Sequence, residues 1–294
     1  MKALLHRRFG LPADPWAGCH LPTADATRVS QAVEAAAEAQ LLVSILGARG
    51  AGKTHAVRQA LRGLRDIRTV EPLRLGRERL HIGDIESAII RELAPHERPR
   101  RSGEARSHQV RRVLGQGAQT HPVILLIDDA HVLHRATLRA LKRLRELSWL
   151  GVARLLGIVL LGQADRAASI PELGLRSDRL WLAGLLPEEA EAALERALNR
   201  RGRAIVIEPE ATAALGASAQ ARNWLDLAAL ADDCLLEAAA RGEDRITAAV
   251  ADAVLDPQRY AEESLDERIL PDDGAVAALL GRLDVAGRRE TKVA

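Results

Sequence analysis

Residues 47–54 read G-A-R-G-A-G-K-T and follow a short apolar run, residues 41–46, that is long enough for a buried strand. The glycines let the backbone curl with positive φ at low steric cost, so that successive N–H groups can cradle phosphate oxygens. Lys53 would place a point charge on the β- and γ-phosphates, and the Thr54 hydroxyl would be a ligand for Mg²⁺. The helix that follows would direct its N-terminus, which favours anions, at the same place.

This spacing matches G-x-x-x-x-G-K-[ST] at every position and predicts a site for ATP with Mg²⁺. The alternative is a chance glycine-rich turn. The residues expected to contact the nucleotide are Gly47, Ala48, Arg49, Gly50, Ala51, Gly52, Lys53, Thr54 and His55.

A second signal is the segment V-I-L-L-I-D-D-A-H, residues 123–131, in which an apolar strand ends in two acids. Nucleotide hydrolases of the P-loop class hold Mg²⁺ at such a position. We therefore expect Asp128 to face the metal through its water shell, with Thr54 as the other metal residue. Asp129 is the expected base that orients the attacking water, and its short side chain predicts slow hydrolysis. The alternative is that both acids cap the turn that follows.

Other polar residues lie where they could sense or stabilise the phosphates. Gln163 follows an apolar strand and is the candidate γ-phosphate sensor, with a plain loop amide as the alternative. Arg176 and Arg179 precede the last predicted strand, and either is a candidate for an arginine supplied to a neighbouring subunit; a surface arginine is the alternative. Arg222 begins a predicted helix from which it could reach back to the nucleotide.

Two arginine-rich clusters flank the strand that ends at Asp128. One contains Arg98, Arg100, Arg101, Arg106, Arg111 and Arg112, and the other contains Arg135, Arg139, Lys142, Arg143 and Arg145. Clusters of this kind neutralise DNA phosphates and give salt-sensitive, sequence-independent binding, whereas the alternative is a solvated helix face. The residues proposed for DNA are Arg98, Arg100, Arg101, Arg106, Arg139, Lys142 and Arg143. Aromatic residues are not interleaved, so base stacking on single strands is not indicated.

Composition limits the class of protein. The 294 residues carry a net charge of only +2, so a nucleic-acid surface must be local. Cys19 and Cys234 lack metal-like spacing, which favours free thiols and a cytoplasmic location. We see no signal peptide and no apolar run of membrane-spanning length, so no membrane partner is expected.

The elements that must position these residues alternate along the first part of the chain. Strands are expected at residues 41–46, 67–75, 123–127, 155–161 and 180–182, and helices at residues 27–40, 83–93, 106–115 and 138–150. This alternation predicts a doubly wound α/β fold with a parallel sheet.

From residue 187 onward the strand patterns stop. Helices are expected at residues 187–201, 209–215, 222–240 and 246–255, which would form a small all-α lid. We therefore predict an irregular N-terminal extension at residues 1–26, an α/β nucleotide-binding core at 27–186, a helical lid at 187–255 and a C-terminal tail at 256–294.

The order of these motifs resembles one branch of the AAA+ ATPases. The motifs are the P-loop, L-L-I-D-D-A-H-V-L, V-L-L-G-Q-A-D, L-R-S-D-R-L and A-R-N-W-L-D-L-A-A-L-A-D-D-C-L-L-E-A, preceded by H-R-R-F-G-L-P-A-D-P-W. The resemblance covers roughly residues 6–255. It is to the group that contains phage Mu B-type proteins, TnsC/TniB transposon ATPases and ExeA-type secretion ATPases, and it is greatest for the Mu B type.

The resemblance implies an ATP-dependent oligomer, often a helical filament, on double-stranded DNA that selects target DNA and stimulates a DDE transposase. By position it assigns nucleotide and Mg²⁺ to Lys53 and Thr54, the acidic pair to Asp128 and Asp129, and the lid sensor to Arg222. The departure is Asp129, where the family usually has glutamate. The alternatives are an ExeA-like or other remodelling ATPase with no DNA role, and a small-molecule kinase, for which no acceptor segment is evident.

Overall fold

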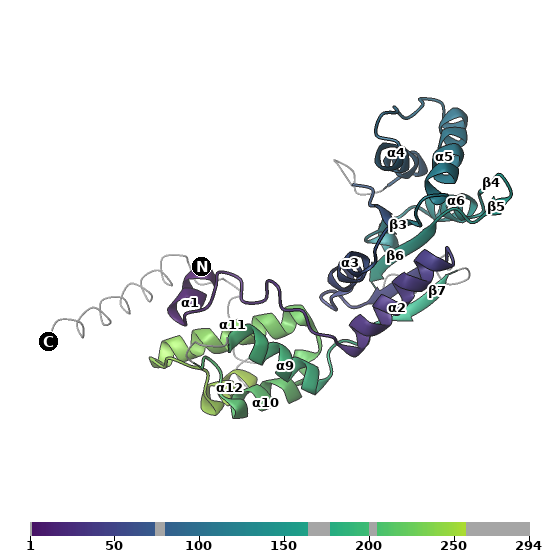
Figure 1. Cartoon of the computed structure of the whole chain (residues 1–294). Coiled ribbons are helices and arrows are strands. Elements are labelled where there is room, and N and C mark those ends of the chain that lie inside the picture. The colour runs from purple at the N-terminus through teal and green to yellow at the C-terminus, as the bar shows by residue number, and fades with distance from the viewer. Residues whose placement is uncertain (1, 74–79, 164–176, 200–204, 257–294) are drawn as a thin grey trace.

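The computed structural model describes residues 2–73, 80–163, 177–199 and 205–256. These residues form two lobes, one of strands and helices and one of helices alone, joined side by side (Figure 1). The candidate site lies where the lobes meet, so the fold is described here as far as it positions that junction.

The sheet of the first lobe has five strands, and all the pairings are parallel. They are β1 (Leu42–Gly47), β2 (Arg68–Val70), β3 (Val123–Ile127), β6 (Gly157–Gln163) and β7 (Asp178–Trp181), in the spatial order β2-β3-β6-β1-β7. Because the strands are parallel, the residues that follow β1, β3 and β6 meet at one edge of the sheet. Ligands of open α/β sheets bind outside this carboxyl edge.

Helices cover both faces of the sheet (Figure 1). α2 (Ala24–Glu38) and α3 (Lys53–Gly63) pack on one face, and α4 (Ile82–Leu93), α5 (Gly103–Ala118) and α6 (Arg135–Arg145) pack on the other. In β3, Ile124 and Leu126 belong to the first core cluster, whereas Leu125 and Ile127 belong to the second. A strand buried on both sides is apolar at every position. The predicted doubly wound α/β fold is confirmed.

The second lobe is helical in the residues described. It contains α9 (Pro187–Leu198), α10 (Pro209–Ala217), the 3₁₀ turn η2 (Ala219–Arg222), α11 (Trp224–Arg241) and α12 (Ala248–Leu255). Its core is built mainly from Leu, Ala and Val side chains. An isolated parallel bridge joins Ile207 to Ile246.

The N-terminal residues pack on this helical lobe. Residues 1–26 were expected to be irregular, which was wrong for α1 (Lys2–Arg8). Leu5 and Phe9 are buried in the helical core, and His6 Nε2 lies 2.7 Å from Asp232 Oδ1 of α11. With only seven residues, this helix shows little apolar periodicity, and the prolines that follow it in the sequence favoured an irregular segment. The division of the chain into independently folding domains stays a prediction.

One predicted helix was wrong over its last five residues, 146–150. Residues 138–150 were expected to be helical, but α6 ends at Arg145 and a two-stranded hairpin follows, β4 (Ser148–Trp149) paired with β5 (Val152–Ala153). Leu150 and Gly151 form the turn with φ of 48° and 84°. A helix cannot continue through two residues in the left-handed region, and Trp149 is instead held against α5 at Gly115.

The remaining boundaries differ by a few residues. A strand was expected over residues 67–75, and within the described part, residues 67–73, it forms over Arg68–Val70. The expected helix at 222–240 begins at Trp224 because Asn223 caps it, its Oδ1 accepting from Leu225 N at 2.9 Å. The last part of the expected helix at 187–201, and the tail from residue 257, lie outside the described residues.

We expect Gly157→Ala to destabilise the fold by about 1–3 kcal/mol, the usual cost of overpacking. Gly157 begins β6 where α2 crosses it, and a Cβ there would lie 2.1 Å from the Ala36 carbonyl oxygen. Urea denaturation followed by circular dichroism would measure the loss. Gly103→Ala is the matched control, because nothing lies within 4 Å of its added Cβ. Equal stability of both variants would contradict the close packing of α2 on the sheet.

Candidate nucleotide-binding site

The loop between β1 and α3 has the geometry of a phosphate cradle. Gly50 and Gly52 have φ of 84° and 80°, values that most residues adopt only with strain. Lys53 Nζ lies over the loop and donates to the carbonyl oxygens of Gly47, at 3.0 Å, and of Ala48, at 2.7 Å. The Lys53 ammonium and the free N–H groups at the start of α3 therefore converge on the space in front of this loop.

Thr54 and Asp128 meet at the carboxyl edge of the sheet. Thr54 Oγ1 donates to Asp128 Oδ2 at 2.7 Å, and Asp129 N donates to Asp128 Oδ1, also at 2.7 Å. A hydroxyl and a carboxylate side by side are the oxygen donors that Mg²⁺ takes in nucleotide sites. The pair fits a magnesium ion bound next to the phosphates, as the sequence predicts.

Asp129 and Gln163 lie at the same edge of the sheet, Asp129 directly after Asp128 and Gln163 at the end of β6, which runs between β3 and β1. Asp129 is exposed and has φ of 47°, so it caps the short 3₁₀ turn η1 (Ala130–Val132) from the left-handed region. Gln163 ends β6, where its Cα pairs in register with Gly47 at the start of the loop. Its backbone N donates to His131 Nδ1 at 3.3 Å. The structure thus places both predicted residues at the same edge as Lys53.

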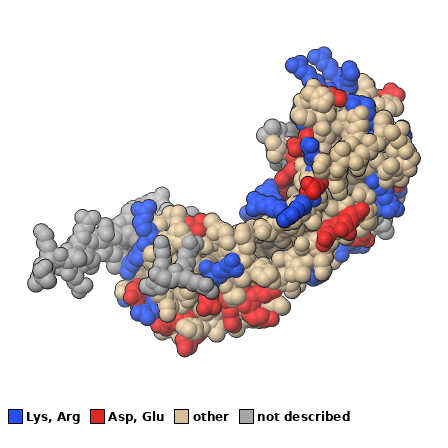
Figure 2. All heavy atoms as spheres, viewed as in Figure 1, with Lys and Arg blue, Asp and Glu red and all other residues tan. Residues whose placement is uncertain are grey.

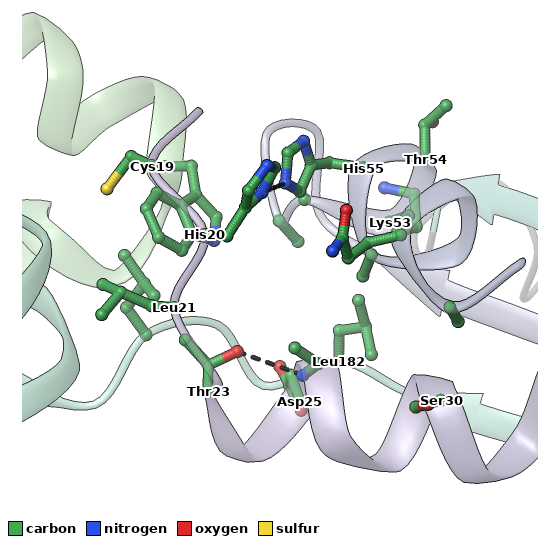
Figure 3. Close-up of a pocket in the computed structure, with 18 of the residues that line it drawn as sticks. Cys19, His20, Leu21, Thr23, Asp25, Ser30, Lys53, Thr54, His55 and Leu182 are labelled. Atoms are coloured by element: carbon green, nitrogen blue, oxygen red, sulfur yellow. Dashed lines mark hydrogen bonds between the residues drawn. The ribbon is translucent and has the colours of Figure 1, made fainter. Parts of the chain in front are cut away.

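A cavity of about 700 Å³ continues from the loop toward the helical lobe. Its walls come from the N-terminal segment, α2, α3 and the start of α11, and Figure 3 shows the side chains of Leu21, Thr23 and Leu182 around it. This volume lies within the range of about 300–1,000 Å³ that is usual for small-molecule sites. Phosphate donors at one end and an apolar wall at the other fit a nucleotide.

The start of α11 contacts the loop directly through Asn223 and Trp224, whereas the sequence pointed to Arg222 at this place. Asn223 Nδ2 donates to the Arg49 carbonyl oxygen, and a Cβ on Gly50 would meet the Asn223 side chain. Trp224 lies against Gly52, whose added Cβ would be 3.1 Å from the indole.

Trp16 also lines the cavity, from the opposite chain end. Aromatic residues make up only 2% of the chain, so the presence of a tryptophan in each of these two segments is a sequence signal for their meeting at the cavity.

The predicted arginines are separated by the fold. Arg222 ends η2, where its Nη1 donates to the Leu185 carbonyl oxygen at 3.4 Å and its own carbonyl accepts from Leu185 N at 2.9 Å. It therefore holds the connection between the lobes. Arg179 is exposed on β7, an edge strand of the sheet. Arg176 lies outside the described residues.

The first basic cluster divides into two groups. Arg106 and Arg112 are partly buried and form ion pairs, Arg106 Nε with Glu86 Oε2 at 3.0 Å, and Arg112 with Glu97. The hydrogen bond from the Arg112 guanidinium lowers the pKa of Glu97 below its usual value, and it is the largest contribution to that shift. By contrast, Arg98, Arg100 and Arg101 are exposed and form no ion pair with the described residues.

Positive charge gathers at the end of the α/β lobe over the connection between α4 and α5 (Figure 2). Acidic side chains gather instead on the helical lobe in the same view. In the second cluster, Arg139 and Arg143 are exposed on α6, whereas Lys142 Nζ is 3.3 Å from Glu146 and Arg145 donates to the Gln40 carbonyl. The small net charge of the chain therefore conceals a local basic surface.

Two histidines join the N-terminal segment to α3. His20 Nδ1 and His55 Nε2 are 2.9 Å apart, with the rings stacked at 4.9 Å between centroids (Figure 3). Partial burial lowers the pKa of His55, with smaller contributions from the charges of His20 and Arg62. The contact therefore favours the neutral imidazole of His55.

We expect the His20–His55 contact to weaken in acid. The pKa of folded His55 lies below its ordinary 6.5, so the contact is at full strength above pH 6.5 and is lost as the pH falls toward the folded value. The free energy of unfolding of the wild type should therefore drop more steeply between pH 7.5 and pH 5.5 than that of His55→Gln. Urea denaturation at several pH values measures this, and parallel profiles would contradict the prediction.

No helix among the described residues combines the length and the apolarity needed to cross a membrane. No group of three or more His, Cys, Asp or Glu side chains is placed to hold a metal ion in that part of the chain. The carboxylate–hydroxyl pair at the loop remains the candidate metal position there.

Residues 36–170 match the AAA domain family. Solved structures give a consistent comparison. The Aeropyrum pernix ORC2 protein in ADPNP and ADP complexes has a TM-score of 0.54 at 16% identity, over 82% of this chain and 70% of that one. A chain of Drosophila ORC bound to DNA has a TM-score of 0.58 at 14% identity, over 87% of this chain and 65% of that one. Cdc6p from Pyrobaculum aerophilum has a TM-score of 0.55 at 18% identity, over 77% of this chain and 65% of that one.

The chain thus spans less than two thirds of the Drosophila and Pyrobaculum chains. No curated protein matches it. At these identities the solved structures show the fold, and the family match covers the segment that carries the loop, the acidic pair and Gln163. The chain contains an AAA-type P-loop ATPase domain in a fold similar to that of the ORC and Cdc6 proteins.

Proposed function

We propose that this protein is an ATP-dependent AAA+ ATPase that binds double-stranded DNA without sequence preference and oligomerises on it. The observation that carries the proposal is the group of exposed arginines, Arg98, Arg100 and Arg101, on the same lobe as a complete phosphate loop. Their guanidinium groups form no ion pair with the described residues, so no carboxylate in that part of the chain must be displaced when they meet phosphates.

The residues around the loop divide the nucleotide chemistry among them. ATP with Mg²⁺ would supply the transferable γ-phosphate. Lys53 and the loop N–H groups would neutralise the phosphates, and Thr54 with Asp128 would hold the ion. Asp129, which is exposed beside them, would accept a proton from water. Its side chain is one methylene shorter than glutamate, and so we infer slow hydrolysis.

Oligomerisation gives the exposed edge of the sheet a role. Arg179 lies on β7 at that edge and is a candidate for reaching the nucleotide of a neighbouring subunit, as is Arg176. Arg222 would act within its own subunit, because it holds the connection between the lobes at Leu185. ATP would then stabilise the assembly, and hydrolysis would release it.

A finer assignment rests on the motifs quoted from the sequence. We propose that the assembly, in helical form, selects target DNA and stimulates a DDE transposase, as the resemblance to Mu B-type and TnsC/TniB proteins implies. The DNA-bound ORC structure of similar fold is compatible with a DNA partner. A purified transposase assayed with and without this protein and ATP would test the finer assignment.

The DNA part of the proposal is tested by fluorescence anisotropy of a labelled duplex. We expect tight binding with a slowly hydrolysed ATP analogue, weaker binding with ADP, and the weakest binding without nucleotide. Duplexes of unrelated sequence should bind alike. Binding of the nucleotide with no binding of the duplex in any state would contradict the proposal, and would favour a remodelling ATPase with no DNA role.

A further inference from the structure

The turn of the β4–β5 hairpin presents an apolar side chain where hairpins ordinarily have polar residues or glycine. Leu150 is 78% exposed, the largest exposed fraction among the large apolar side chains described. It occupies the first position of a two-residue turn with φ of 48°, and Gly151 follows with φ of 84°. Such turns favour Asn-Gly or Asp-Gly, because both positions need positive φ. Leu150 is therefore both strained and solvated, a combination found at functional sites.

The hairpin is held rigidly behind this turn. Trp149 packs on α5 so closely that a Cβ on Gly115 would lie 2.1 Å from its side chain. Arg111 Nε donates to the Ser148 carbonyl oxygen at 2.7 Å, and Arg154 N donates to the Leu147 carbonyl at 3.2 Å. The exposed tip is thus fixed to α5, the helix that begins directly after Arg98, Arg100 and Arg101.

The surroundings of the tip favour a polyanion. Arg111 and Arg154 are both exposed at the base of the hairpin, and the nearby carboxylate of Glu146 is engaged with Lys142. The apolar surface consists of Leu150 and Val152, which are 78% and 53% exposed. This is narrow for a protein partner, because stable protein interfaces bury about 800 Å² on each side. Apolar wedges flanked by basic residues are used to enter base steps of duplex DNA.

We propose that the hairpin is a wedge for duplex DNA: Leu150 enters between two base pairs from the minor groove, while Arg111 and Arg154 contact the flanking phosphates. The inference rests on the proposed DNA-binding function and adds to it a deformation of the bound duplex. Pyrimidine–purine steps unstack most easily and occur in almost any duplex, so Leu150 would enter at those steps while duplexes of unrelated sequence still bind alike.

The test uses a duplex that carries 2-aminopurine, whose fluorescence rises when a base unstacks. Full-length wild-type protein with an ATP analogue should raise the fluorescence on binding. Leu150→Asn should remove the rise and weaken binding by roughly tenfold, while the salt dependence of binding stays the same. Asparagine suits the left-handed turn position, so this variant should fold at least as well as the wild type. Leu236→Ala, at a 43% exposed position on α11, is the control and should behave as the wild type.

Other outcomes overturn the wedge in distinct ways. A fluorescence rise that persists in Leu150→Asn, or tight wild-type binding without any rise, would show that Leu150 does not enter the duplex. Loss of self-association without DNA in Leu150→Asn would assign the tip to a contact between copies of the chain. Failure of the proposed function would be seen earlier, because the wild type would then bind no duplex in any nucleotide state.

Discussion

Lys53→Ala should strongly weaken ATP binding and, together with it, ATP-dependent assembly on duplex DNA. Lys53 Nζ lies over the loop within 3.0 Å of two carbonyl oxygens, where it can move onto the phosphates. Loss of a charge-assisted contact of about 1.5–3 kcal/mol lowers affinity roughly ten- to hundredfold, and loss of the charge balance at the phosphates adds to this. Isothermal titration with an ATP analogue would measure it.

The control for this substitution is Lys142→Ala, which makes the same side-chain change on α6. Lys142 pairs with Glu146 far along the chain from the loop, so that variant should bind ATP normally. Thermal denaturation would show that Lys53→Ala is folded. Assembly of Lys53→Ala on DNA with unchanged ATP dependence would contradict a switch at this loop.

Arg100→Ala combined with Arg101→Ala should weaken duplex binding and reduce its salt dependence, with ATP binding intact. Both arginines are exposed in the connection between α4 and α5. Each phosphate contact contributes about −0.9 to the slope of log affinity against log salt concentration, so the slope should fall in magnitude by about 1.8. Anisotropy titrations from low to moderate salt would measure the change.

The matched control is Arg7→Ala combined with Arg8→Ala, which removes the same charge from α1 on the helical lobe. This variant should keep the wild-type slope, because its two arginines lie on the other lobe. If the salt-dependence slope is unchanged in the Arg100–Arg101 variant, or is reduced equally in both variants, then Arg100 and Arg101 do not contact DNA.

Much of the nucleotide site could be predicted from local sequence. The glycine spacing fixes the loop, and the apolar run at residues 123–127 identifies a strand buried on both faces, so that Asp128 must end at the carboxyl edge. The register that places Gln163 beside Gly47 follows from the parallel pairing of β1 and β6. These features depend on neighbours within a few residues or on the general geometry of parallel sheets.

The features that escaped prediction depend on distant contacts. The helical pattern of residues 138–150 is broken because Trp149 packs against Gly115 of α5. Trp224 contacts the loop at Gly52, and His20 contacts His55 in the first turn of α3. The two residues come from opposite ends of the chain, and no local pattern predicts these contacts. Likewise, Arg106 looks like its neighbours in the sequence, and only the fold pairs it with Glu86.

The central claim is that nucleotide at the loop controls assembly on DNA. Electron microscopy of the purified protein with ATP, ADP or no nucleotide, each with and without duplex DNA, tests it most directly. The account predicts filaments or rings with ATP and DNA together, and their absence with ADP or without nucleotide. Monomers under every condition, or the same assemblies whatever the nucleotide, would contradict it.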